Sequence, residues 1–243
     1  MIKSITPISA NIQAAPSPYI SQGLKLSLGL GLGLALLFNS YAQAQESSAI
    51  NYDYWQVSGA IAKSSIEPYG RKYNTKTKVI DVEFSALVAE DTYFIANVEK
   101  SYTNDSEIEN GVRLNAKNNA LTISGGIGFI IPVDERFHFV AEVGALTRKQ
   151  DVSASVGALT QSEQDKRSTD FLWSLGFRAK LTEQMMLETK YSQAGNVKRL
   201  HIGGPIALTE NVGLEIGYTL SKDTTPRVRN KSSAVSLGFR WRY

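Results

Sequence analysis

The sequence predicts an all-β fold: an antiparallel up-and-down transmembrane β-barrel of about ten strands, which follows an N-terminal signal peptide. Three observations predict it. Apolar and polar residues alternate with a period of two after residue 51, as on the two faces of a β-strand. The segments between these stretches are alternately short and long, as in membrane barrels. An apolar run near the N-terminus has the form of a secretory signal.

The N-terminal region has the three parts of a secretory signal peptide. Lys25 precedes an uncharged apolar run at residues 26–38, and Ala42 and Ala44 form the small-residue pattern of a cleavage site. A membrane-anchoring helix is the alternative, but the run is too short for a bilayer core, which needs roughly 20 residues. Cleavage after Ala44 makes Gln45 the first residue of the mature chain. The chain therefore divides into a removed signal peptide (1–44), a short N-terminal segment (45–51) and a barrel (52–243).

Composition limits the classes of function. The chain has 243 residues, enough for one barrel, and no cysteine, which excludes disulfides and thiolate metal sites. Its net charge of +3 includes Lys3 and Lys25, both in the signal peptide. Charges nearly balance in the rest of the chain, so we predict no nucleic-acid partner.

Alternation is clearest at the end of the chain. One face of this strand is apolar and aromatic, with Val235, Leu237, Phe239, Trp241 and Tyr243. The other face is small or cationic, with Ala234, Ser236, Gly238, Arg240 and Arg242. Earlier stretches repeat the pattern at 55–61, 80–88, 121–131, 137–145, 171–179 and 212–220. Weaker strands fit near 92–102, 185–193 and 199–208.

The connections alternate in length, as they do between the two ends of an outer-membrane barrel. Short turns are expected at 89–92, 132–136, 182–184 and 209–211. Long polar loops are expected at 65–76, 103–118, 149–168 and 222–231, with a shorter one near 194–198. This count gives ten strands with both termini at the periplasmic end. Because Gly203, Gly204 and Pro205 are poor strand residues, an eight-stranded barrel with one loop hairpin is the alternative.

The chemistry of the two strand faces separates a membrane barrel from a soluble one. A soluble barrel has its apolar face inside, whereas here large apolar residues oppose Gly, Ser, Thr and charged residues. A narrow lumen fits small or paired polar side chains, and only a closed barrel leaves no backbone group unpaired in lipid. The aromatic residues Phe239, Trp241 and Tyr243 fit a C-terminal insertion signal. We therefore expect the outer membrane of a Gram-negative bacterium as the location, reached through the signal peptide.

Repeated hairpins carry a resemblance to a known family. The segments are SLGFRWRY (236–243), LGFRAKLTEQMMLETKY (175–191) and IGGPIALTENVGLEIGY (202–218). On these residues the chain resembles the small outer-membrane β-barrel proteins, as a single-domain member of the OmpA-type transmembrane β-barrel superfamily. The resemblance covers about residues 52–243, but ten strands exceed the family's usual eight, and no peptidoglycan-binding domain follows. It implies a monomer that is inserted by the barrel assembly machinery and contacts outer-membrane lipid and lipopolysaccharide.

Residues that would make an envelope hydrolase are sparse. Lipid A deacylases and omptin proteases depend on histidine beside serine or acidic groups, and this chain has only His138 and His201. No serine follows His201 two residues on, and Glu142 is about 13 Å from His138 along its strand. Carboxylates do not cluster at metal-ligand spacing. We therefore predict no enzymatic activity, no metal site and no cofactor.

Charged residues recur on the polar strand faces and predict ion pairs in the lumen. The candidates are Glu142, Arg178, Glu188, Lys190, Glu215 and Arg240. Strand pairing places Arg178 near Glu188 or Lys190, and the last hairpin brings Glu215 close to Arg240. Because buried charges are tolerated only when paired, we expect the pairs to fill the lumen. An ion-lined channel is the alternative.

These observations predict a non-enzymatic outer-membrane barrel whose surface loops serve envelope or surface interactions. A narrow passive porin-like channel for small solutes is the alternative function. Two predicted loops are rich in bases, with Arg71, Lys72 and Lys76 in one and Lys222, Arg227, Arg229 and Lys231 in the other. Lipopolysaccharide carries phosphates at that height, so electrostatic binding by these bases is a further expectation.

Overall fold

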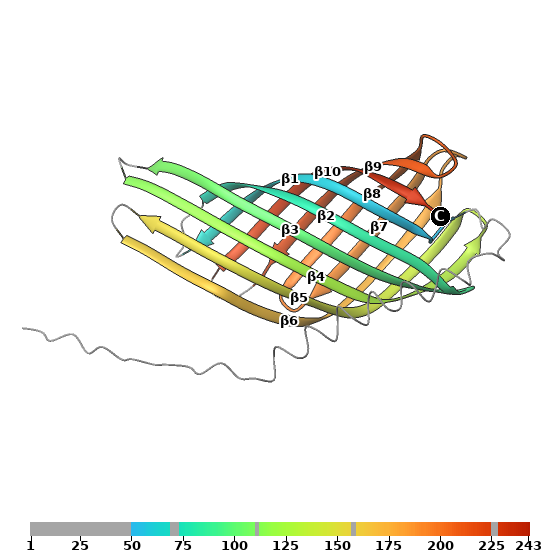
Figure 1. Ribbon diagram of the computed structural model, residues 1–243, viewed down its shortest axis with the longest axis horizontal. Helices are drawn as coiled ribbons and strands as arrows, with labels where there is room; N and C mark the ends of the chain where they lie inside the picture. The colour runs from blue at the N-terminus through green and yellow to red at the C-terminus, as the bar shows by residue number, and fades with distance from the viewer. Residues whose placement is uncertain (1–49, 69–72, 110–111, 157–158, 225–227) are drawn as a thin grey trace, which may run out of the picture. The chain divides into compact units, whose positions relative to one another are not determined.

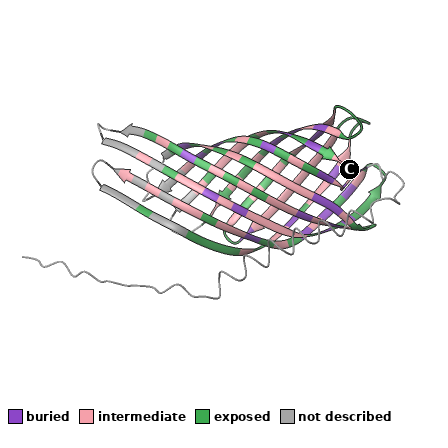
Figure 2. Cartoon of the chain, viewed as in Figure 1, coloured by how far each residue is buried: buried purple, intermediate pink, exposed green. Residues whose placement is uncertain are grey.

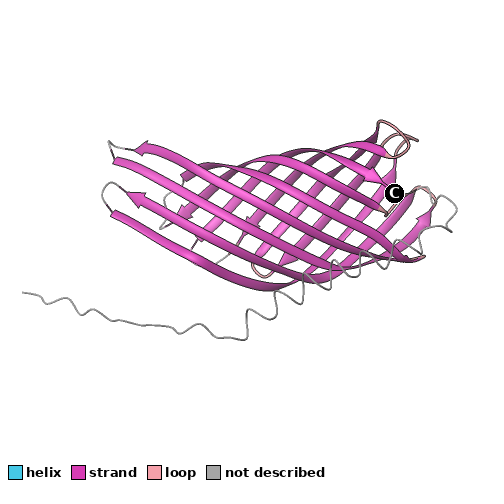
Figure 3. Cartoon of the chain, viewed as in Figure 1, coloured by secondary structure: helices cyan, strands magenta, loops and turns pink. Residues whose placement is uncertain are grey.

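The computed structural model describes residues 50–68, 73–109, 112–156, 159–224 and 228–243. These residues form ten strands, drawn in magenta in Figure 3. The strands are β1 (Tyr54–Pro68), β2 (Tyr73–Ala89), β3 (Thr92–Glu109), β4 (Val112–Asp134), β5 (Phe137–Val156), β6 (Leu159–Lys180), β7 (Met186–Ala194), β8 (Val197–Ala207), β9 (Val212–Asp223) and β10 (Val228–Arg242). The described part of the chain contains no helix that is long and apolar enough to cross a membrane.

The strands close into one antiparallel barrel (Figure 1). Each strand pairs with the next in sequence, and β1 pairs with β10 along its whole length, from Tyr54 opposite Arg242 to Pro68 opposite Val228. Closure gives every strand two neighbours, so the wall of the barrel has no free edge. The predicted all-β barrel with ten strands is confirmed.

β8 shows why ten strands form instead of eight. The strand continues through Gly203, Gly204 and Pro205, and it pairs with β7 and β9 on its two sides. Gly204 has a φ of 151°, a backbone conformation that residues with a side chain rarely adopt. The glycine that weakens the sequence signal is therefore the residue that this position in the wall requires.

The predicted long loops at 103–118 and 149–168 are wrong. β3 and β4 continue to Glu109 and from Val112, and β5 and β6 continue to Val156 and from Leu159. The predicted loops at 65–76 and 222–231 also begin and end in strand. Apolar alternation fades in these segments although their backbone still pairs, so alternation alone reveals only part of each strand.

β3–β6 extend beyond the other strands at one end of the barrel, toward the left of Figure 1. At this end, the last pair between β2 and β3 is Thr77 with Thr103, and the last pair between β7 and β6 is Ala194 with Leu172. Beyond these pairs, four strands continue as a sheet, which we call the β3–β6 extension. We call the end of the barrel that carries this extension the loop end. The opposite end, where β2, β4, β6, β8 and β10 end, is the turn end.

The two faces of the wall differ in chemistry, as the sequence predicts. Exposed residues alternate with more buried ones along the strands (Figure 2). Large apolar side chains point outward; Ile61, Phe171 and Val235 are 63%, 66% and 61% exposed. The inward positions hold small, polar and charged residues, including buried Ser58, Glu142 and Arg240.

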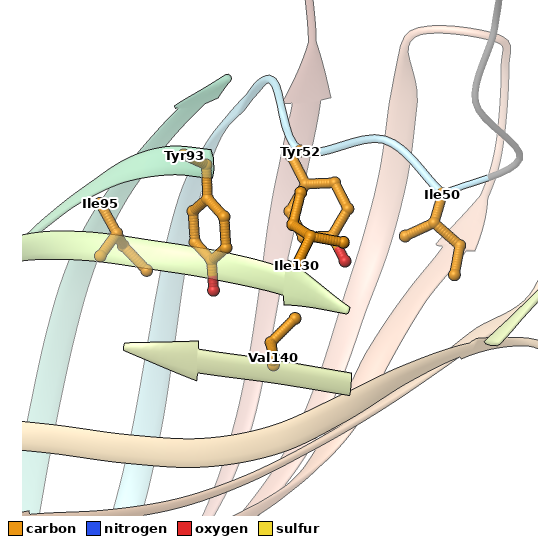
Figure 4. Close-up of a cluster of buried hydrophobic side chains, with 6 residues drawn as sticks. All are labelled: Ile50, Tyr52, Tyr93, Ile95, Ile130 and Val140. Carbon is orange, nitrogen blue, oxygen red and sulfur yellow. The ribbon is translucent and has the colours of Figure 1, made fainter. Parts of the chain in front are cut away.

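An apolar cluster occupies the lumen at the turn end. It comprises Ile50, Tyr52, Tyr93, Ile95, Ile130 and Val140 (Figure 4). Leu87 and Met186 pack against it. Ile50 and Tyr52 precede β1, so the chain enters the barrel at this end before the first strand begins. Gly128 makes room for the cluster, because a side chain there would clash with the ring of Tyr93.

Candidate functional site in the barrel lumen

Glu188 of β7 is the centre of a buried charge network above the apolar cluster. Its Oε1 lies 2.6 Å from Arg240 Nη1 and 3.7 Å from Arg178 Nε. Arg240 belongs to β10 and Arg178 to β6, so one carboxylate joins three strands. The arginine side chains are only 3% and 5% exposed, so Glu188 compensates two charges that water does not reach.

Arg240 has a partner for each part of its guanidinium group. Nη2 lies 3.1 Å from Glu215 Oε2, and Nε donates to Gln56 Oε1 at 2.9 Å. The guanidinium also lies 4.2 Å from the centre of the Tyr54 ring, within the range of a cation–π interaction. These contacts fix Arg240 across the lumen.

Lys190 forms the second branch of the network. Its Nζ lies 3.5 Å from Glu142 Oε2 on β5 and 4.0 Å from Glu83 Oε2 on β2. Glu142 also accepts hydrogen bonds from Tyr93 Oη at 2.8 Å and Ser174 Oγ at 2.6 Å. β2 and β7 are not neighbours in the wall, so this branch crosses the lumen.

Tyrosines join the charge network to the apolar cluster. Arg178 lies 4.3 Å from the centre of the Tyr52 ring, and its Nη2 donates to Tyr54 Oη at 3.1 Å. Tyr54 Oη in turn donates to Glu83 Oε1 at 2.7 Å. Tyr52 Oη lies 3.1 Å from Nδ1 of His138, and the two rings stack. His138 therefore contacts Tyr52, which the sequence did not predict.

The segment before β1 is held by two polar groups that are partly withdrawn from water. Burial raises the pKa of Tyr52 to about 12, so its hydroxyl is neutral at physiological pH. Burial also raises the pKa of Asp53, and the hydrogen bond from the Leu87 amide opposes that shift. Asp53 Oδ1 accepts this bond at 2.6 Å, which ties the segment to β2.

A polar cavity of about 440 Å³ continues from the charge network toward the loop end. Arg199 and Glu99 face each other across it, with Nη1 2.9 Å from Oε2. His201 Nδ1 lies 3.0 Å from Thr219 Oγ1 on the next strand. Among the described residues, no cluster of histidines and carboxylates is arranged to hold a metal ion.

The structure brings all the predicted lumen residues into one network. Arg178 is near Glu188, as expected, and Glu215 is near Arg240. The sequence did not identify Glu188 as the shared partner of both arginines. It also missed the role of Tyr52, Tyr54 and Tyr93. The inward position of Tyr54 could have been predicted from alternation, because Tyr54 lies on the same strand face as the inward residues Gln56 and Ser58.

The predicted insertion-signal residues lie outside the lumen. Phe239, Trp241 and Tyr243 are exposed on the outer face, and Tyr243 Oη donates to the Ser85 carbonyl at 3.0 Å. The cleavage residues Ala42, Ala44 and Gln45 lie outside the described residues, as do the loop bases Arg71, Lys72 and Arg227.

Comparison with known proteins shows likeness of fold alone. No family model matches the chain, and no curated protein matches it. The transport unit of the autotransporter AIDA-I from Escherichia coli aligns with a TM-score of 0.51 and 8% identity, over 86% of this chain and 96% of that one. The translocator domain of NalP from Neisseria meningitidis gives 0.49 and 10%, over 92% and 98%. The attachment invasion locus protein Ail of Yersinia pestis gives 0.41 and 12%, over 79% and 100%.

The chain thus shares its fold with the AIDA-I transport unit, a protein of very different sequence. Membership of the OmpA-type superfamily stays a prediction, because no family model matches.

Proposed function

We propose that this protein is a non-enzymatic, non-conducting barrel of the outer membrane, which presents the β3–β6 extension for interaction at the cell surface. The outer face supports the membrane location. Exposed apolar residues occur on it from β1 to β10, including Ile80, Ile127, Phe171, Leu200 and Leu237. A continuous apolar surface around a closed barrel is the arrangement that lipid requires.

A substitution pair on β10 tests the membrane location. Leu237 points outward and is 57% exposed. Leu237→Arg places a cation in the apolar belt and should reduce the free energy of folding into lipid vesicles by about 2–4 kcal/mol. Leu237→Ala is the matched control and should cost much less. Equal losses for the two variants would contradict the location of this face in lipid.

The observation that supports a non-conducting barrel is the set of contacts across the lumen. Lys190 on β7 meets Glu83 on β2, and Arg178 on β6 meets Tyr54 on β1. Below them, Tyr52 and Ile50 fill the turn end. Side chains from opposite walls therefore block the passage between the cavity and the turn end.

Single-channel recording on the refolded protein tests this proposal. We expect planar bilayers that contain the wild-type protein to show little conductance. The narrow passive channel is the second candidate, and the polar cavity of about 440 Å³ favours it. A large and steady wild-type conductance would overturn the non-conducting proposal and support the channel.

The β3–β6 extension supports an interaction role because its two edge strands have unpaired backbone groups. Past residue 103, β3 pairs only with β4, and before residue 172, β6 pairs only with β5. Such edges offer hydrogen bonds to an extended segment of another protein.

Deletion of residues 105–116 and 151–166 tests this role, because it shortens the extension and leaves the barrel strands intact. Photo-cross-linking from Thr169, an exposed residue of β6, should detect protein neighbours in whole cells carrying the full-length chain. We expect the deletion to abolish these products without changing the unfolding midpoint of the barrel. An unchanged cross-linking yield would contradict the role.

A further inference from the structure

Lysines on the outer face of the loop end lie directly opposite one another. Lys63 of β1 is paired with Lys76 of β2. Lys222 of β9 is paired with Lys231 of β10 on one side and with Lys198 of β8 on the other. All five are exposed. Like charges directly opposite each other destabilise a sheet, so this arrangement favours an anion that neutralises them.

A groove of about 530 Å³ joins three of these lysines over β1. Lys63, Lys76 and Lys231 line it, together with Ser65, Asn74 and Ser233. Ser65 lies opposite Lys231 on one side and Asn74 on the other, and Lys63 lies opposite Ser233. Side chains directly opposite have Cβ atoms roughly 5 Å apart, and diagonal neighbours roughly 7–8 Å apart. Three flexible ammonium groups therefore reach a common anion.

The groove has few groups that would neutralise the lysines from within the protein. Asp105 is the acid among its described lining residues, and its Oδ2 accepts a hydrogen bond from the backbone amide of Lys76 at 3.0 Å. None of the three lysine ammonium groups has an ion pair with a described residue. Ser65 Oγ is buried and has no hydrogen-bond partner. The lining thus offers positive charge and a hydroxyl group.

Apolar side chains lie next to the groove on the same outer face. Leu220 lines the groove itself. Ile61 and Val235 follow Lys63 and Ser233 by two positions toward the turn end, and they are 63% and 61% exposed. The groove therefore lies where the apolar belt ends, which is the height of lipid headgroups in a membrane barrel.

We propose that this groove binds a phosphate group of a membrane glycolipid. Lys63, Lys76 and Lys231 contact the phosphate, and the acyl chains lie along Ile61, Leu220 and Val235. A lipid is the source of the phosphate because the groove and the apolar residues share one face. This inference rests on the proposed outer-membrane location. It joins bases from two predicted loops with Lys63, which lies in neither loop.

Native mass spectrometry of the refolded full-length protein in dodecyl maltoside tests the proposal. The protein is titrated with diphosphoryl lipid A, and dissociation constants are compared between variants. The combined variant Lys63→Gln, Lys76→Gln and Lys231→Gln should bind about 100-fold more weakly, because each cation near an anionic lipid surface contributes a factor of about five. Its unfolding midpoint in urea, which should match the wild type, verifies that the barrel still folds.

The matched control removes the same number of positive charges from other positions on the outer face. Lys100, Lys117 and Lys149 are exposed on β3, β4 and β5, and their combined change to Gln should leave lipid A binding within a few-fold of wild type. Equal loss in both triple variants would overturn the groove as a site. Displacement of lipid A by equimolar inorganic phosphate would overturn the lipid as its source. The titration depends on neither conductance nor the β3–β6 extension, so its failure is distinct from failure of the proposed function.

Discussion

The two halves of the lumen are built by the same ten strands but differ in what they hold. In the turn half, Arg178 and Arg240 are almost fully buried, and their shared partner Glu188 is 13% exposed. The loop half contains a polar cavity lined by small residues, among them Ala62, Ser64, Ala120, Ser232 and Ala234. The width of the barrel allows either outcome, so side-chain length at the inward positions decides whether the lumen is filled or open.

The largest effect should come from removing the shared carboxylate of the turn half. Glu188→Gln leaves two buried guanidinium groups with one remaining acid nearby, and breaking a buried ion pair costs about 3–5 kcal/mol. Urea unfolding of the protein in lipid vesicles, followed by tryptophan fluorescence, measures this loss. A loss below about 1 kcal/mol would show that water reaches the arginines.

Truncating Tyr52 of the apolar cluster should have the next largest effect. Tyr52 is 1% exposed, and Tyr52→Ala should lower the free energy of unfolding by about 2–3 kcal/mol through lost apolar burial. Conductance should stay low, because the charge network still crosses the lumen. Tyr52→Phe keeps the ring and is the matched control. If Tyr52→Ala opens a steady channel, the apolar cluster and not the charge network closes the lumen.

Glu215 tests how the network shares its charges. Because Glu188 still pairs with Arg240, Glu215→Gln should cost about 2 kcal/mol, less than Glu188→Gln. Arg240→Gln also removes the partner of Glu188, so it should cost more than Glu215→Gln. The double variant should lose less than the sum of the two single variants, because the Glu215–Arg240 pair is then broken only once. Strictly additive losses in the double variant would show that the two side chains do not interact.

The smallest effect should come from the loop half. Arg199 is 33% exposed and Glu99 18%, so water in the cavity can solvate Arg199 after its partner is removed. Glu99→Gln should therefore cost only about 1 kcal/mol in the same urea experiment. A loss as large as that of Glu188→Gln would mean that both halves of the lumen exclude water equally.

Strand faces could be predicted because alternation in a β-strand is fixed by geometry. Trp241 points outward and Arg240 inward, as the sequence indicates. Pairs within one hairpin were also accessible, since Arg178 and Glu188 lie opposite each other across β6 and β7. The contact between Glu188 and Arg240 was not accessible, because β7 and β10 are separated by two strands and meet only across the closed lumen.

The position of Tyr52 and the β3–β6 extension could not be predicted from the alternation of apolar and polar residues. Tyr52 precedes the first strand, so no periodic pattern indicates that it turns into the lumen. The sequence of the β3–β6 extension is mostly polar, and a polar segment predicts a loop unless its pairing partners are known. In both cases the missing information is tertiary: a contact with the far wall in one, and a neighbouring strand in the other.

Pairing between β1 and β10 has a consequence for how the protein is made. Trp55 lies opposite Trp241, so the first strand cannot gain its second neighbour until nearly the whole chain has been synthesised. Contacts so distant in sequence form slowly. Until then β1 and β9 have open edges, and unpaired strand edges invite aggregation. A product truncated before Val228 would keep both edges open and should therefore aggregate more readily than the full chain.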